Sequence, residues 1–82
     1  MSAPFRELET VVLRRDIPEV GLRAGDLGTV VQLYSADAVE VEFVTAAGRT
    51  QALLTLAAQD LRPVADNDLL TVRPTPPTRG AA

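Results

Sequence analysis

Apolar and polar residues alternate most regularly in residues 38–44. Every second position there is apolar: Val39, Val41 and Phe43. Glu40 and Glu42 lie between them. Because successive side chains of a strand point to opposite faces of a sheet, this alternation predicts a strand with one buried and one solvated face.

Two β-branched runs, residues 10–14 and 28–34, predict two earlier strands. In the first run Val11 and Leu13 share one face. The apolar residues of the second run do not alternate strictly, and we expect a bulge near Val31 to restore the inward face.

Three elements are predicted after the central strand. Residues 49–54 indicate a fourth strand, and residues 55–60 indicate a single helical turn with Thr55 as its N-cap. Residues 61–64 predict a short fifth strand. Pro63 has no backbone N–H and therefore restricts this strand to an edge of the sheet.

Glycines mark the connections. Gly21, Gly25 and Gly28 fall in or beside the long connection of residues 17–27, and Gly48 ends the predicted hairpin loop. Glycine tolerates positive φ and close approach of two chains, so we assign all four a structural role in turns. Two apolar residues are expected to pack beneath the long connection: Ile17 and Leu22.

This order of elements predicts an all-β fold, a small SH3-like barrel of five strands with one short helical turn before the last strand. The barrel occupies residues 10–64, after a lead-in of residues 1–9. Residues 65–82 form an extension, of which the proline-rich part, 73–82, is predicted to be disordered. Three residues of the extension are too apolar for a free tail and are expected to add a strand to this sheet or to another chain: Leu69, Leu70 and Val72.

Composition removes several functions. The 82 residues suffice for one small domain. The chain has no Cys and no His, which removes thiolate metal sites and the commonest general base. The glycine loop precedes a strand and lacks the Lys of a phosphate-binding loop. We therefore expect no enzymatic activity, no cofactor and no metal site. The charged N-terminus and the short apolar runs predict a cytoplasmic protein without membrane contact.

Residues 21–31 read G-L-x-x-G-D-x-G-T-V-V, and further characteristic stretches are V-V-L at 11–13, V-E-F at 41–43 and L-L-T-L at 53–56. This pattern, over residues 8–63, resembles a small uncharacterised bacterial family of unknown function. The resemblance implies an SH3-like barrel. Its members are often short proteins, sometimes encoded beside another small protein in the manner of a toxin–antitoxin pair. Residues 25–30 are also similar to KOW-type domains and to the barrel of the nitrile hydratase β subunit.

These observations predict a non-enzymatic protein-binding module, an antitoxin-like or accessory partner of a neighbouring gene product, with a homo-oligomer left open. Exposed strand edges and an acidic stripe could bind a basic partner. The candidate contact residues lie in the long loop, the strands and the extension: Glu19, Arg23, Tyr34, Glu40, Glu42, Leu69, Leu70 and Val72.

The alternative is a KOW-like module that binds RNA or another nucleic acid. Arg14, Arg15 and Arg23 could form a basic patch, with Tyr34 as a platform on which a base stacks. The formal net charge of −3 does not favour this alternative, because nucleic-acid binders usually present a basic face.

Overall fold

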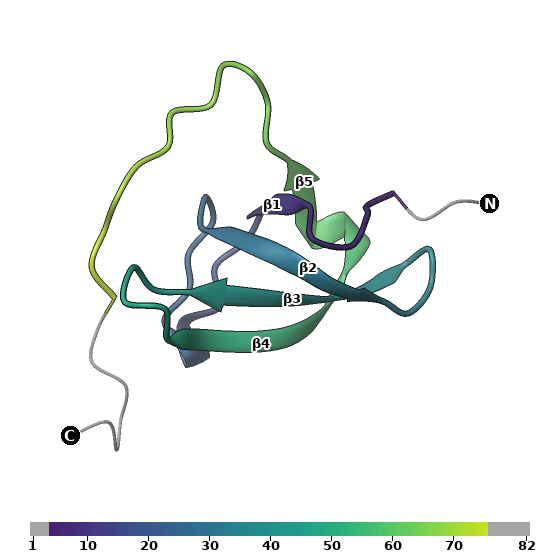
Figure 1. Cartoon of the computed structure of the whole chain (residues 1–82), viewed down its shortest axis with the longest axis horizontal. Helices are drawn as coiled ribbons and strands as arrows, with labels where there is room; N and C mark the ends of the chain where they lie inside the picture. The colour runs from purple at the N-terminus through teal and green to yellow at the C-terminus, as the bar shows by residue number, and fades with distance from the viewer. Residues whose placement is uncertain (1–3, 76–82) are drawn as a thin grey trace.

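A computed structural model describes residues 4–75 and shows one antiparallel sheet (Figure 1). Its strands are β1 (Thr10–Leu13), β2 (Leu27–Leu33), β3 (Ala38–Val44), β4 (Thr50–Ala57) and β5 (Leu61–Pro63). Two 3-10 turns, η1 (Pro18–Val20) and η2 (Ala58–Asp60), lie in the connections. The predicted all-β class and the helical turn before the last strand are confirmed.

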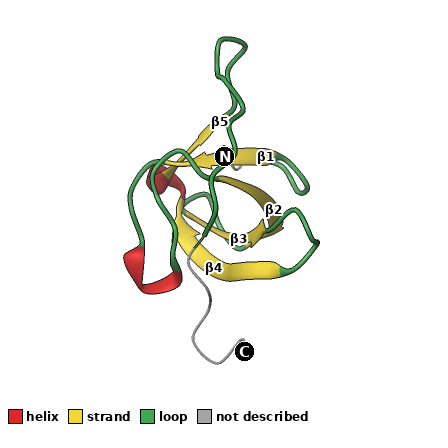
Figure 2. Ribbon diagram, turned by 90° about the vertical axis from the view of Figure 1, so that its left-hand side faces the viewer, coloured by secondary structure: helices red, strands yellow, loops and turns green. Residues whose placement is uncertain are grey.

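The strand order is β4-β3-β2-β1-β5, so β4 and β5 each have a neighbour on one side only. The sheet curls, and β1 and β5 lie above β3 and β4 in Figure 2. No strand pairing within residues 4–75 joins β4 to β5, so the sheet stays open where the sequence led us to expect a barrel.

The core lies inside this curl. Its most deeply buried side chains come from the first three strands: Val11, Leu13, Val30, Val39 and Val41. Phe43 completes the inward face of β3, as the alternation predicted. Ile17 and Leu22 are bridged to each other and buried beneath the long connection, which confirms their predicted packing.

The predicted bulge in β2 is confirmed, because the register with β3 shifts between Val30 and Gln32. The predicted end of the fourth strand is wrong. Thr55 pairs with Glu40 inside β4 and caps no helix, and the helical turn begins only at Ala58. The reason is packing: Leu54 and Leu56 continue the inward face of β4, so pairing with β3 persists through Ala57.

Three of the four glycines occupy turns with positive φ: Gly21, Gly25 and Gly48. Gly28 differs from its predicted turn role, since it lies inside β2 and faces the core. A Cβ at this position would lie 2.5 Å from Cγ1 of Val41 and 2.8 Å from Cε2 of Phe43. Gly28 is therefore required by the close approach of β3 side chains and not by its backbone angles.

Residues 65–75, called the strap below, leave β5, arch away from the sheet and return toward the β3–β4 hairpin (Figure 1). They contain no strand, so the extra strand expected around Leu69–Val72 does not form in this sheet. The predicted disorder of residues 73–82 stays a prediction for 76–82, which lie outside the described residues. Arg73 to Thr75, in contrast, hydrogen-bond with the body of the domain.

None of the helices in residues 4–75 is long and apolar enough to cross a membrane.

Candidate protein-interaction surfaces

The structure divides the predicted contact residues into two groups on different parts of the molecule. Tyr34, Glu40 and Glu42 belong to the outer face of the sheet. Arg23 of the long loop and Leu69, Leu70 and Val72 of the strap line one groove. Glu19 is exposed on η1 and belongs to neither group. The sequence could not separate these groups, because it predicts which residues are exposed but not which exposed residues lie on the same surface.

The acidic stripe lies in the middle of the outer face. Register places Glu42 between Thr29 of β2 and Leu53 of β4. Thr50 donates a hydrogen bond of 2.5 Å from its hydroxyl to Oε2 of Glu42. Glu42 therefore has the polar Thr29 on its β2 side and the apolar Leu53 on its β4 side, whereas Glu40 lies between Gln32 and Thr55.

Tyr34 belongs to the same outer face. Partial loss of solvent, followed by the negative charge and hydrogen bonding of Glu40, raises the pKa of Tyr34 above its ordinary 10.0. Tyr34 therefore stays a neutral phenol at physiological pH. Its ring is half exposed beside a carboxylate, which is an unfavourable place for a nucleic-acid phosphate.

The free edge of β4 is the feature of this face that the sequence analysis missed. All eight residues of β4 are uncharged, and none is Pro or Gly. Among residues 4–75, no strand other than β3 pairs with β4, and no loop backbone group bonds to it. Leu53, in the middle of β4, is 52% exposed. Natural sheets usually protect such an edge with charge, proline or a bulge, because unpaired N–H and C=O groups bind further strands. β4 has a bulge at Gln51, near its start, and no charge or proline along the rest of the strand.

The opposite edge is protected. β5 lies at an edge, as predicted from Pro63, and has only three residues, one fewer than expected; its middle residue is the charged Arg62. The guanidinium of Arg62 donates two hydrogen bonds to Asp68, at 2.8 and 2.9 Å. The two edges of the sheet are thus unequal, and β4 is the one that is open to a partner.

The Arg62–Asp68 pair fixes the start of the strap. Asp68 also accepts a hydrogen bond of 2.7 Å from the Ala65 N–H. The hydrogen bonds from Arg62, and then that from Ala65, lower the pKa of Asp68 from 3.8 to about 2.

We expect this contact to be lost only in strong acid. A carboxyl whose pKa is lowered by folding contributes stability that is complete above its ordinary pKa of 3.8, and that is lost as the pH falls through about 2. An NMR titration of the Asp68 side-chain carbon should give a midpoint near pH 2 in the native chain. Arg62→Gln should move the midpoint back toward 3.8. A midpoint near 3.8 in the native chain would show that the pair does not form in solution.

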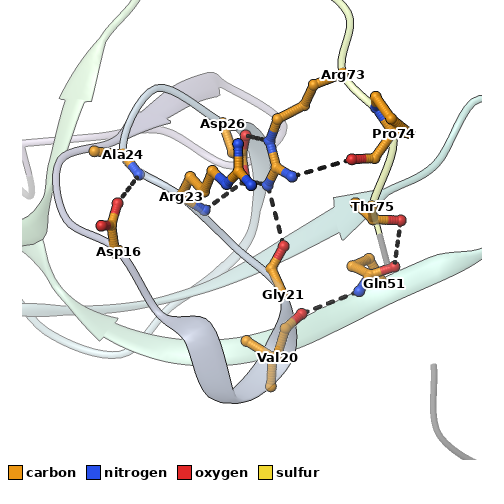
Figure 3. Close-up of polar contacts among 10 residues, drawn as sticks. All are labelled: Asp16, Val20, Gly21, Arg23, Ala24, Asp26, Gln51, Arg73, Pro74 and Thr75. Atoms are coloured by element: carbon orange, nitrogen blue, oxygen red, sulfur yellow. Dashed lines mark hydrogen bonds and ion pairs between the residues drawn. The ribbon is translucent and has the colours of Figure 1, made fainter. Parts of the chain in front are cut away.

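The end of the strap is held by Arg73, which lies beside the glycine loop (Figure 3). Arg73 Nε donates to Asp26 Oδ1 at 2.9 Å, and its Nη2 donates to Asp26 Oδ2 and, at 3.0 Å, to the carbonyl oxygen of Gly21. Both side chains of the ion pair are partly exposed. Burial alone would raise the pKa of Asp26, but hydrogen bonds from Arg73 and the Arg23 N–H, and the charges of both arginines, bring it below 3.8.

Gln51 joins three segments at the same end of the molecule. Its Nε2 donates to the carbonyl oxygen of Val20 at 3.0 Å, and its Oε1 accepts a hydrogen bond of 3.4 Å from the hydroxyl of Thr75 (Figure 3). The start of β4, η1 and the end of the strap therefore meet around one side chain.

The apolar residues of the strap remain in solvent between these two attachments. Leu69 is 89% exposed, Leu70 70% and Val72 100%. Single exposed apolar residues are common on protein surfaces, whereas three within four positions suggest a contact with another molecule. This exposure fits the partner role expected for them.

The basic residues of the nucleic-acid alternative do not gather around Tyr34. Arg14 and Arg15 follow β1, whose end pairs with the start of β2 through Val12 and Leu27. Tyr34 follows the opposite end of β2, about 20 Å away at ~3.3 Å per residue. Arg15 is further paired with Asp60 at 3.1 Å. In residues 4–75 no group of three or more metal-binding side chains comes together.

Sequence reasoning missed the residues that hold the strap. Asp26 follows Gly25 in the long connection, and Arg73 lies 47 positions further along the chain. No periodicity connects two positions so far apart. The alternating signs of Arg62, Asp68, Arg73 and Asp26 were the only available signal, and surface charges of both signs are common.

No curated protein and no solved structure matches the chain. A family model, described as a domain of unknown function (DUF4926), matches residues 7–63. The match includes all five strands and Asp26, and it ends before the strap. Because it spans well over half of the sequence, the chain belongs to this family of uncharacterised domains.

Proposed function

We propose that the chain is a non-enzymatic protein-binding domain that acts in the bacterial cytoplasm as an accessory or antitoxin-like partner of a protein encoded beside it. The observation that carries the proposal is the free edge of β4. Eight uncharged residues leave their outer backbone groups without partners in the described part of the chain. An extended segment of another protein can add to such an edge as a further strand.

The outer face next to this edge supplies specificity. Main-chain hydrogen bonds would hold the added strand, and side chains at alternate positions would read its sequence. Glu40 and Glu42 lie one strand away from the edge, and Leu53 is exposed on the edge strand itself. This arrangement favours a partner segment with an apolar residue and basic neighbours, because opposite charges across an interface speed association and exclude wrong partners.

We also assign the fold to the SH3-like class. Two features support this assignment: the strand order β4-β3-β2-β1-β5 and the curl of the sheet around one core. In this interpretation β4 and β5 are the strands between which the barrel stays open. A binding edge at the opening is compatible with a stable core.

The nucleic-acid alternative has weaker support. Its basic residues and Tyr34 lie at opposite ends of β2, and Tyr34 has Glu40 as its neighbour. Binding to single-stranded RNA that falls steeply as salt is raised would reverse this preference, because contacts with phosphate release counterions.

Leu53→Lys is expected to reduce retention of the partner by about tenfold or more, equivalent to ~1.4 kcal/mol. The added charge blocks the open edge while leaving the buried face of β4 unchanged. The measurement is co-expression with the adjacent gene product, a pull-down on a tag, and quantification of the complex.

Val64→Lys is the matched control, since it places the same charge just beyond β5 at the opposite edge. Its complex should match that of the native chain, and both variants should keep the native melting temperature. A native chain that stays monomeric and retains no partner at micromolar concentration would contradict the proposal.

A further inference from the structure

The strap encloses a groove without filling it. The space between the strap and the sheet has a volume of about 880 Å³. Its floor contains apolar side chains of the body: Val12, Leu22, Leu27, Phe43 and Val44. Leu69 and Val72 remain almost wholly in solvent above it. The strap is therefore held by polar contacts at its ends and gains little from apolar burial.

The acceptors for Arg73 form a site of defined shape, called the cradle below: the carboxylate of Asp26 and the carbonyl oxygen of Gly21. The two carboxylate oxygens of Asp26 accept hydrogen bonds from Nε and Nη2 of Arg73. The carbonyl oxygen of Gly21 accepts a further hydrogen bond from Nη2. A planar guanidinium can satisfy all three acceptors at once. The ammonium of Lys lacks this geometry, so the cradle selects Arg.

The cradle is positioned by residues of the domain itself. The Arg23 N–H donates to Asp26 Oδ2 at 2.8 Å and fixes the carboxylate. The backbone of Leu13 bonds both to Gly25 N–H, at 2.7 Å, and to the carbonyl of Asp26, at 2.9 Å, which ties the loop to β1. Gly21 adopts φ 73° after η1 and donates its N–H to the carbonyl of Pro18. None of these contacts involves the strap, so the cradle does not need Arg73 in order to form.

The cradle and its occupant belong to different parts of the chain. Gly21 and Asp26 lie within the matched residues 7–63, whereas Arg73 lies outside them. A site built by the domain is thus filled by a residue from an extension.

We propose that the cradle and groove bind an extended, arginine-bearing segment of a partner protein, and that Arg73 competes for the same site within the chain. The partner's arginine takes the place of Arg73 on Asp26 and Gly21, and its apolar neighbours cover the floor of the groove. Partly exposed ion pairs are individually weak, so such a segment can displace the strap. Gln51 is the one residue of β4 among those that line this site, and the test of the site does not depend on the proposed function.

The test uses the full chain carrying Arg73→Gln and a blocked synthetic peptide, D-L-L-T-V-R-P-T, which copies residues 68–75. A neighbouring segment competes at an effective concentration near the millimolar range. Removing this competition should lower the Kd for the peptide about tenfold relative to the native chain. Calorimetry gives the Kd, and NMR should show shifts of the amides of Gly21, Arg23 and Asp26.

A peptide with Gln in place of its Arg is the matched control, because it leaves the protein unchanged. It should lose binding to the Arg73→Gln chain, and a Lys peptide should bind more weakly than the Arg peptide. Equal binding of the Arg and Gln peptides, or equal affinity of the native and Arg73→Gln chains, would overturn the proposal. So would a native chain that dimerises at micromolar concentration while the Arg73→Gln chain is monomeric, because the cradle would then bind a second copy.

Discussion

Gly28→Val should leave the domain largely unfolded at room temperature or lower its melting temperature by ~15 °C or more. Gly28 faces the core from β2, and a Cβ there would lie 2.5 Å from Cγ1 of Val41. That atom belongs to a fully buried side chain on the neighbouring strand, and Cε2 of Phe43 would lie only 2.8 Å away on the same side. Forced overpacking of this kind costs about 3 kcal/mol or more. A domain of this size has only about 5–10 kcal/mol of stability in total.

Circular dichroism during thermal melting measures this effect, and Thr29→Val is its matched control. The control places the same valine side chain at the adjacent position of β2, where a threonine of similar size already points to the outer face beside Glu42. It should melt within a few degrees of the native chain, since surface substitutions usually change stability by less than about 0.5 kcal/mol. If Gly28→Val melts like the native chain, the close approach of β2 and β3 described above is wrong.

Leu13→Ala is expected to destabilise the domain by about 2–5 kcal/mol. Leu13 is 1% exposed and is among the largest fully buried side chains. It comes from β1, which pairs with both β2 and β5. Shortening it leaves a cavity at the junction of these strands, which the surrounding backbone can fill only partly. Urea unfolding with an unchanged slope would measure the loss directly.

Leu69→Ala is the matched control, because it makes the same Leu-to-Ala substitution in a side chain that is 89% exposed. Its effect on unfolding should stay within about 0.5 kcal/mol. A large loss of stability in Leu69→Ala would show that the strap packs against the sheet in solution. Its apolar residues would then be buried within the chain and not exposed to a partner.

The two proposed surfaces would bind a partner segment through different chemical groups. The β4 edge offers backbone groups without side-chain protection, and it would bind any extended segment that also suits the acidic face. The cradle offers three oxygen acceptors fixed by local hydrogen bonds, and it would bind one kind of side chain. Variants at Leu53 and Arg73 separate the two surfaces experimentally, because Leu53 lies on β4 and Arg73 lies in the strap.

The sequence determined the strands in which the local pattern of apolar residues matches the side chains that are buried in the fold. Alternation in β3 located both ends of the strand, and the irregular apolar spacing of β2 located its bulge. Pro63 identified the edge to which β5 belongs. The end of β4 was misplaced, because Thr55 fits an N-cap locally and only pairing with Glu40 keeps it in the strand.

By itself, the sequence determined a small all-β domain with inward-facing valines and leucines, since hydrophobic periodicity is a local property that each strand carries alone. Only the tertiary structure decided that β4 is the open edge, that Gly28 lies against Val41, and that Arg73 reaches Asp26. The physical reason is that these contacts join segments that are far apart in the sequence and come together only when the sheet curls. The spacing of residues along the chain does not predict such contacts.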